Sequence, residues 1–159
     1  MDYTPIAIQT AHENGLDPAL VQAICHVESG WDTYAMRYEP QFEARYLTGL
    51  DFRRVSPCSR DTERKGRAMS WGLMQVMGQV ARELGFDGPY LSALCDPALG
   101  LRYGCLHLRR KMDKYGSQGI EAVISAYNAG QPVRRPDGTW ANGIYVRMVL
   151  EQLQKYKET

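Results

Sequence analysis

The sequence has 159 residues, of which 44% are hydrophobic and 23% are charged, so it can form one compact domain and is not broadly disordered. Its formal net charge of +1 is too small to indicate nucleic-acid binding. No stretch approaches the roughly 20 apolar residues of a membrane-spanning helix, so we expect no membrane insertion. Because no repeat or linker is visible, we predict a single domain over residues 1–159.

Two helices are predicted near the N-terminus. Thr4-Pro5 is typical of a helix start and Gly15 of its end. Asp17-Pro18 repeats the start signal and predicts a second helix over about residues 18–29. This second helix is largely apolar, which leaves little polar surface for Glu28 near its C-terminal end.

Glu28 is the main candidate for chemistry. A carboxyl group in partly apolar surroundings has its ionised form disfavoured, so its pKa rises. The negative end of the helix dipole acts in the same direction. A raised pKa suits a general acid near neutral pH, and we predict that role for Glu28.

The segment from residue 32 to 69 has weak periodicity and many turn signals. One short helix is expected around Phe42 to Leu47. We predict an extended loop or lid over about residues 38–69, with a helical hairpin as the alternative. The basic residues between Arg53 and Arg67 are interrupted by Asp61 and Glu63, which favours a solvated loop over an anion-binding patch.

The rest of the sequence predicts a mainly α chain. Apolar spacing and capping signals indicate helices over residues 72–84, 89–94, 97–115, 117–127 and 143–157, with a loop over 130–138.

The cysteines and histidines do not indicate a metal site. The four cysteines show no C-x-x-C spacing, and the three histidines form no ligand pattern. Cys25 and Cys105 fall on apolar helix faces and are expected in the core. We expect reduced thiols.

Three strings occur in a characteristic order: Glu28-Ser29, Gly72-Leu73-Met74-Gln75 and Ala126-Tyr127-Asn128-Ala129-Gly130. Together they resemble the lytic transglycosylase domain of the soluble-transglycosylase type, over about residues 5 to 150. The resemblance implies the mainly α, lysozyme-like fold of goose-type lysozymes and lytic transglycosylases. The string from Ser70 to Met77, with a long segment before it, is most similar to phage-encoded members.

The resemblance implies cleavage of the β-1,4 bond between N-acetylmuramic acid (MurNAc) and N-acetylglucosamine (GlcNAc) in peptidoglycan glycan strands. Glu28 would protonate the glycosidic oxygen and then, as a carboxylate, take a proton from the muramic acid C6 hydroxyl. Attack of that hydroxyl on C1 closes a 1,6-anhydro ring. An internal hydroxyl thus replaces a second carboxylate. The chemistry requires no cofactor and no metal.

Further residues match the family motifs. Tyr127 corresponds to a catalytic tyrosine whose hydroxyl orients the acid, although it could instead be a core residue. The substrate groove would involve Ser29, Gly72, Met74, Gln75, Asn128 and Tyr145.

Within this set the expected contributions differ. Gly72 would let backbone approach the sugar, and Gln75 offers an amide to its polar groups. Met74 fits the groove or the core. Ser29 is expected to brace the helix end, and Asn128 to shape the following turn.

The sequence also departs from the family pattern. Arg37 stands where a serine is common, and Ala141-Asn142 replaces a Glu-Thr pair. Glu39 or Glu43 could approach the cleft and activate water, which would give a hydrolytic goose-type lysozyme. A non-catalytic peptidoglycan-binding module of a phage tail is the other alternative.

The N-terminus lacks the pattern of a signal peptide. We therefore expect the chain to reach the cell wall, in the periplasm, by another route. Three routes to the cell wall are possible for such a chain. It could be carried by a virion or tail assembly, pass a membrane pore as a phage lysis protein does, or be part of a longer parent chain.

Overall fold

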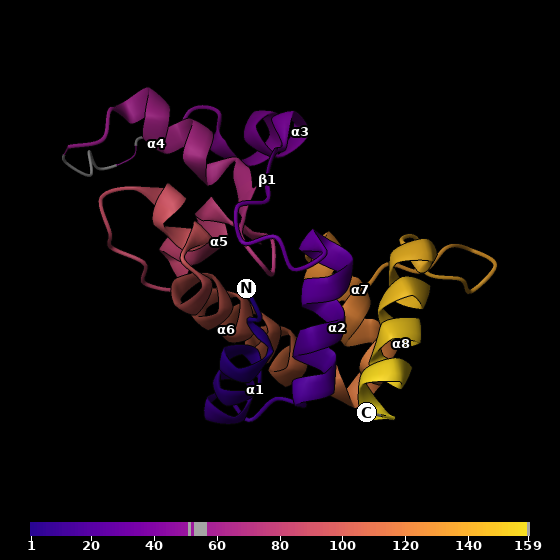
Figure 1. Ribbon diagram of the computed structural model, residues 1–159. Coiled ribbons are helices and arrows are strands. Elements are labelled where there is room, and N and C mark those ends of the chain that lie inside the picture. Colours follow the sequence, from indigo (N-terminus) through magenta and orange to yellow (C-terminus); the bar gives the residue numbers. More distant parts are fainter. Residues whose placement is uncertain (51, 53–56, 159) are drawn as a thin grey trace.

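The computed structural model describes residues 1–50, 52 and 57–158, which form two lobes joined by one long helix (Figure 1). Helices dominate, as predicted. None of the helices in these residues combines the length and hydropathy needed to cross a bilayer.

The first lobe is a bundle of helices around one apolar core. It contains α1 (Thr4–Glu13), α2 (Pro18–Ser29), α7 (Ile120–Ala129), α8 (Gly143–Lys157) and part of α6 (Pro97–Tyr115). Asp17 and Asp96 accept hydrogen bonds from the first turns of α2 and α6, so these two helices begin where the sequence predicts. The core includes the fully buried Leu20, Ile24 and Ile124, together with the predicted Cys25 and Cys105.

The second lobe is built on a small antiparallel sheet of order β1-β2-β3. The strands are β1 (Met36–Tyr38), β2 (Met69–Trp71) and β3 (Val76–Met77), and Arg37 pairs with Ser70 in register. Around it lie α3 (Pro40–Phe42), the π-helix η1 (Glu43–Leu47), α4 (Arg60–Arg67), α5 (Gly78–Glu83) and the 3₁₀-helix η2 (Leu91–Cys95). The 3₁₀-helix η3 (Gly116–Gln118) belongs to the first lobe, where it follows α6 and packs against α7.

The predicted helix over residues 72–84 is wrong in its first half. Gly72 and Gln75 both have positive φ, 69° and 47°, which breaks a right-handed helix there. Val76 and Met77 then pair with β2, and the helix begins only at Gly78. The apolar spacing that favoured a helix instead buries Leu73 and Val76 in the two cores.

In its described residues, the segment over 38–69, for which an extended loop or lid is predicted, contains α3, η1 and α4. The short helix expected near residues 42–47 is present as the end of α3 and η1. Residues 60–67 form α4, so the solvated loop predicted for this basic stretch is wrong there; Arg53 lies outside the described residues.

An ion cluster attaches α4 to α5. Glu63 is 1% exposed and accepts hydrogen bonds from Arg67 and Arg82 at 2.8 to 2.9 Å. Burial raises the pKa of Glu63, but the bonds from Arg82 and Arg67 outweigh it and hold the pKa below its ordinary value. The helices approach so closely that a Cβ at Gly78 would lie 2.2 Å from the Gly66 carbonyl oxygen.

Candidate active site

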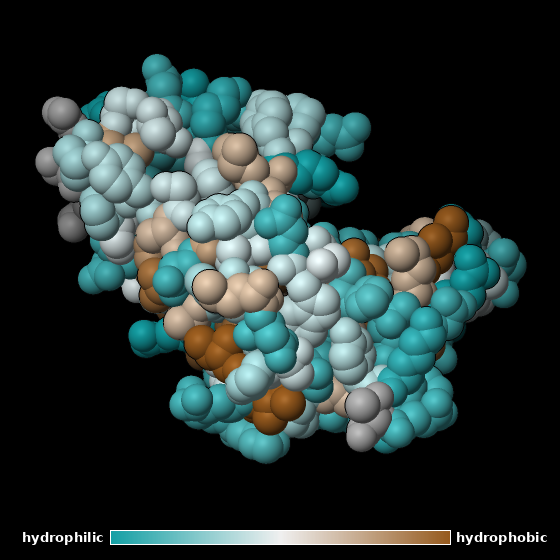
Figure 2. All heavy atoms as spheres, viewed as in Figure 1, coloured by the Kyte–Doolittle hydropathy of each residue, from teal (hydrophilic) through white to brown (hydrophobic). Residues whose placement is uncertain are grey.

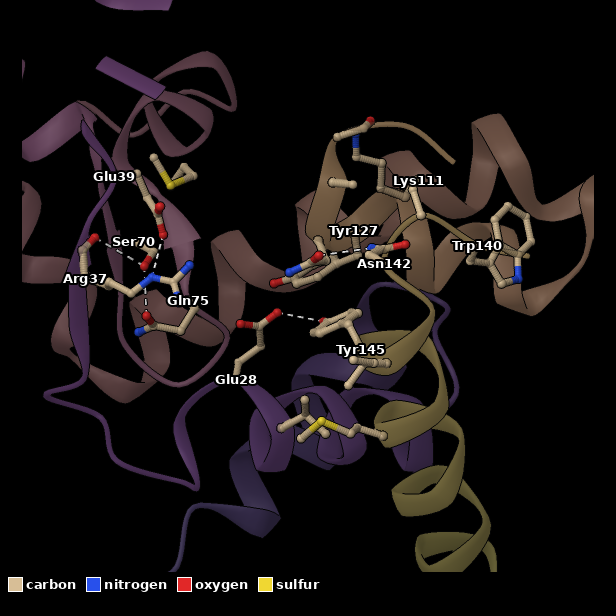
Figure 3. Close-up of a pocket in the computed structure, with 18 of the residues that line it drawn as sticks. Glu28, Arg37, Glu39, Ser70, Gln75, Lys111, Tyr127, Trp140, Asn142 and Tyr145 are labelled. Atoms are coloured by element: carbon tan, nitrogen blue, oxygen red, sulfur yellow. Dashed lines mark hydrogen bonds and ion pairs between the residues drawn. The ribbon is translucent and has the colours of Figure 1, made fainter. Parts of the chain in front are cut away.

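A cleft of about 1380 Å³ separates the two lobes. Figure 2 shows the molecule hollowed between the lobe that carries α3 and α4 and the part that carries the start of α8. The wall on the sheet side includes Arg37, Glu39 and Gln75, and the opposite wall includes Asn142 and Tyr145. Glu28 lies between these walls (Figure 3).

Glu28 occupies the last turn of α2, which ends at Gly30 in the left-handed conformation. The tyrosine hydroxyl of Tyr145, in the first turn of α8, donates a 2.6 Å hydrogen bond to its carboxylate (Figure 3). Burial raises the pKa of Glu28 to about 7, against smaller lowering effects of the Tyr145 hydrogen bond and the Arg37 charge. The raised pKa predicted for Glu28 is therefore confirmed.

The three sequence strings meet beside Glu28. The Ser29 hydroxyl donates to the Leu73 carbonyl oxygen at 2.8 Å, and the Tyr127 hydroxyl donates to the next carbonyl, that of Met74, at 2.7 Å. Two adjacent carbonyls of the Gly72–Gln75 turn are thus held by the ends of α2 and α7. These bonds fix the end of α2 against the turn and explain why the strings occur together.

The hydrogen bond predicted between Tyr127 and Glu28 is wrong. Tyr127 is 6% exposed, and its hydroxyl is directed to the Met74 carbonyl instead. Tyr145 makes the bond that was expected of Tyr127. The sequence contained both tyrosines, but only the packing of α8 against α2 decides which of them reaches the acid.

Three of the predicted groove residues have structural positions outside the cleft wall. Met74 is fully buried against Gly104 and Cys105, so the core alternative is correct. Gly72 is required for packing, because a Cβ there would lie 2.5 Å from the Leu94 carbonyl oxygen, and it does not line the cleft. Ser29 braces the helix end, as its bond to Leu73 shows.

Gln75 lines the cleft, but its amide group is already engaged. Its Nε2 donates to the carbonyls of Ala35 and Gly72 at 2.9 and 3.0 Å, and its Oε1 accepts from Ser70 at 2.8 Å. Both amide hydrogens are used, so only the oxygen has capacity for a further bond. Gln75 therefore connects β2 to the segment after α2, and the sugar contact predicted for it is limited to accepting.

Asn128 lines the cleft beside a residue that sequence reasoning did not select. Asn142 donates to Asn128 Oδ1 at 3.0 Å and to the Ser125 carbonyl at 3.1 Å, and it accepts from the Ser125 hydroxyl at 2.7 Å. These bonds attach the start of α8 to α7, which positions Tyr145 three residues later. The departure at Ala141-Asn142 was the only sequence signal for this role.

Three carboxylates among the described residues line the cleft: Glu28, Glu39 and Asp137. Glu39 pairs with Arg37 Nε at 2.5 Å. Hydrogen bonds from Thr139 lower the pKa of Asp137. Glu43 is not in the cleft wall and pairs with Lys65 and Arg64. Of the three cleft carboxylates in the described residues, only Glu28 accepts a hydrogen bond from a tyrosine hydroxyl, and burial raises its pKa. Outside the cleft, bonds from Lys65 and Tyr38 lower the pKa of Glu43.

Replacing Tyr145 by Phe is expected to raise the pKa of Glu28 above about 7. The hydroxyl stabilises the ionised carboxylate, so its loss favours the protonated form. A ¹³C NMR titration of the Glu28 carboxyl would measure the shift. Tyr156→Phe is the matched control, since that hydroxyl lies on the same helix but contacts His26 and Trp31. An unchanged Glu28 pKa in Tyr145→Phe would contradict the assignment.

Comparisons with known proteins agree with this geometry. The chain is 30% identical over 141 residues to the membrane-bound lytic murein transglycosylase C of Actinobacillus pleuropneumoniae, from serotypes 5b (strain L20), 3 (strain JL03) and 7 (strain AP76). The match covers 80% of this chain and 30% of each relative, so the chain spans less than a third of their length. No solved structure matches significantly. The family described as "Transglycosylase SLT domain" matches residues 5–137, so the chain belongs to the SLT transglycosylase domain family and has its lysozyme-like fold.

Proposed function

We propose that the chain is a peptidoglycan lytic transglycosylase that cuts the β-1,4 bond between MurNAc and GlcNAc. One observation carries the proposal: Glu28 has a pKa near 7 and a fixed orientation at the junction of the two cleft walls. An acid with this pKa can donate a proton near neutral pH and take one back within the same turnover. The curated relatives are named as lytic murein transglycosylases, which agrees with this reaction.

In the first half of the reaction, protonated Glu28 transfers its proton to the glycosidic oxygen. The bond between that oxygen and C1 of MurNAc breaks, and GlcNAc leaves with a free 4-hydroxyl group. Glu28 is then a carboxylate, and the Tyr145 hydroxyl bond at 2.6 Å and the Arg37 charge both favour this ionised form.

In the second half, the Glu28 carboxylate accepts the proton of the MurNAc C6 hydroxyl. The C6 oxygen forms a bond to C1 and closes the 1,6-anhydro ring, and Glu28 is again protonated. No water is consumed, and a nucleophile held in the same sugar has a high effective concentration. A second carboxylate is not required.

Hydrolysis is the second candidate, because Glu39 lines the same cleft. A water activated by Glu39 would attack C1 in place of the C6 hydroxyl. However, Glu39 bonds to Arg37 Nε at 2.5 Å, so that interaction competes with its use as a base. A non-catalytic binding module would gain nothing from an acid with a raised pKa.

Mass spectrometry of fragments released from purified peptidoglycan distinguishes these candidates. We expect muropeptides that end in 1,6-anhydro-MurNAc and are one water lighter than hydrolysis products. A Glu39→Gln protein should still release products that end in 1,6-anhydro-MurNAc. Reducing-end fragments whose release depends on Glu39 would establish hydrolysis. Binding without release of fragments would favour the module.

We further propose that the chain acts on the cell wall in the periplasm and is of a phage type, carried by a virion or tail assembly. The string from Ser70 to Met77 and the inserted elements between β1 and β2 support the subtype. Detection of the chain in purified virions by peptide mass spectrometry would test this. Absence of the chain from purified virions would contradict delivery by a virion or tail assembly and favour another route to the cell wall.

A further inference from the structure

Arg37 lines the cleft and carries hydrogen-bond donors that have no role in the proposed reaction. It lies on β1, the edge strand of the sheet, and its side chain enters the cleft opposite Tyr145 and Asn142 (Figure 3). Its backbone is fixed by pairing with Ser70 of β2.

The guanidinium group of Arg37 is oriented by a hydrogen bond to Glu39. Its Nε donates to Glu39 Oε1 at 2.5 Å, and the Glu39 backbone N–H is itself bonded to the Ala68 carbonyl. Across the part of the chain that the structure describes, the two terminal Nη groups of Arg37 make no hydrogen bond, and the side chain is 76% exposed. Arg37 thus presents a free, planar pair of donors toward the cleft, the geometry that matches a carboxylate.

The charge of the cleft wall fits an anionic ligand. Basic side chains of Arg37, Lys111, Arg135 and Arg147 line it, against the acids Glu28, Glu39 and Asp137. Burial raises the pKa of Glu28 to about 7, so near neutral pH that acid is partly uncharged and the wall is net positive. Arg37 and Glu28 line the same cleft, and the Arg37 charge acts on Glu28.

We propose that Arg37 is a specificity-determining residue that binds a carboxylate on the muramic acid side of the substrate. This inference rests on the proposed function for the identity of the glycan. In peptidoglycan, muramic acid carries a lactyl ether that holds a peptide with free carboxylates. The carboxylate could be one of the peptide or, in strands without peptide, that of the lactyl group. An uncharged glycan such as a chitin oligosaccharide offers neither.

Binding in a Glu28→Gln background tests the proposal without turnover. Three ligands are compared: soluble glycan strands with peptides, the same strands stripped by an amidase, and a chitin oligosaccharide. Adding Arg37→Gln should weaken binding of carboxylate-bearing ligands about tenfold, the scale of a charged hydrogen-bonded pair, and leave the chitin oligosaccharide unchanged. Loss on peptide strands alone identifies a peptide carboxylate. Loss on stripped strands alone identifies the lactyl carboxylate, which is an amide while the peptide is attached. Loss on both means that Arg37 binds either carboxylate.

Two further variants make the result specific. Arg37→Lys keeps the charge but not the paired donors, and it should recover only part of the affinity. Lys157→Gln is the control, because Lys157 is an exposed base on α8 that lies 3.6 Å from Asp17 and does not line the cleft. Its effect should stay below about twofold, within what an exposed ion pair contributes.

The outcomes separate this proposal from the proposed function. Equal weakening on the chitin oligosaccharide, no weakening on any ligand, or no binding at all would overturn the role of Arg37. Cleavage by the wild-type chain together with Arg37-independent binding would overturn that role and leave the transglycosylase intact. If binding depends on Arg37 but the wild-type chain cleaves nothing, the role of Arg37 stands and the proposed transglycosylase activity is overturned.

Discussion

Glu28→Gln is expected to lower the rate of fragment release from peptidoglycan by about 10²-fold or more, the usual contribution of a general acid–base group. Gln keeps the size and shape of the side chain, and its oxygen can still accept the Tyr145 hydrogen bond of 2.6 Å. It cannot donate a proton to the glycosidic oxygen. Initial rates of soluble muropeptide release near pH 7 would measure the loss. A variant that clears cell walls at the wild-type rate would refute the assignment.

The pH dependence of stability shows whether Glu28→Gln is correctly folded. Burial raises the pKa of Glu28 in the folded chain to about 7, from an ordinary value of 4.5. Between these values the folded chain retains a proton that the unfolded chain has lost, so wild-type stability falls as pH rises through this window. Glu28→Gln removes that dependence.

The variant should therefore have a higher melting temperature than wild type at pH 8, and the difference should vanish near pH 4. Glu151→Gln, an exposed glutamate on α8, is the control and should change neither the rate nor this pH dependence. An inactive variant that is less stable than wild type at pH 8 would indicate a folding defect instead of a lost acid.

Much of the helical lobe could be predicted because its signals are local. Asp17-Pro18 and Asp96-Pro97 place a capping carboxylate and a proline at the helix start, and the structure uses both. Residues 143–157 show the apolar spacing of an amphipathic helix, and α8 has these bounds. The position of Glu28 followed from such signals, since it depends only on where α2 ends.

The features that were predicted wrongly depend on distant parts of the chain. Val76 and Met77 have apolar spacing that suits a helix or a strand, and only pairing with β2 decides between them. The composition of residues 60–67 is typical of a solvated loop. Glu63 is nevertheless buried, and it bonds to Arg82, which lies 19 residues later. The choice between Tyr127 and Tyr145 likewise depends on packing between helices.

Glu63→Gln is expected to destabilise the chain by about 3–5 kcal/mol, the usual effect of removing one partner from a buried ion pair. Glu63 is 1% exposed and bonds to Arg67 and Arg82, whose side chains are 14% and 7% exposed. Gln cannot neutralise these guanidinium groups. The melting temperature should fall by roughly 10 °C. Glu83→Gln is the control, because Glu83 lies on α5 as Arg82 does, but its carboxylate accepts a hydrogen bond from Gln79 and not from a buried arginine.

The pH dependence of this difference identifies its cause. The pKa of Glu63 is lowered in the folded chain, so its ionic contribution is present above the unfolded value near 4.5 and is lost as pH falls through the folded pKa. Wild type and Glu63→Gln should therefore differ fully at pH 7 and converge in acid. A difference that stays constant down to low pH would mean that shape, and not charge, attaches α4 to α5. Because α4 supports the lobe that carries Arg37, a charge-dependent loss should also weaken binding in the cleft at temperatures below global unfolding.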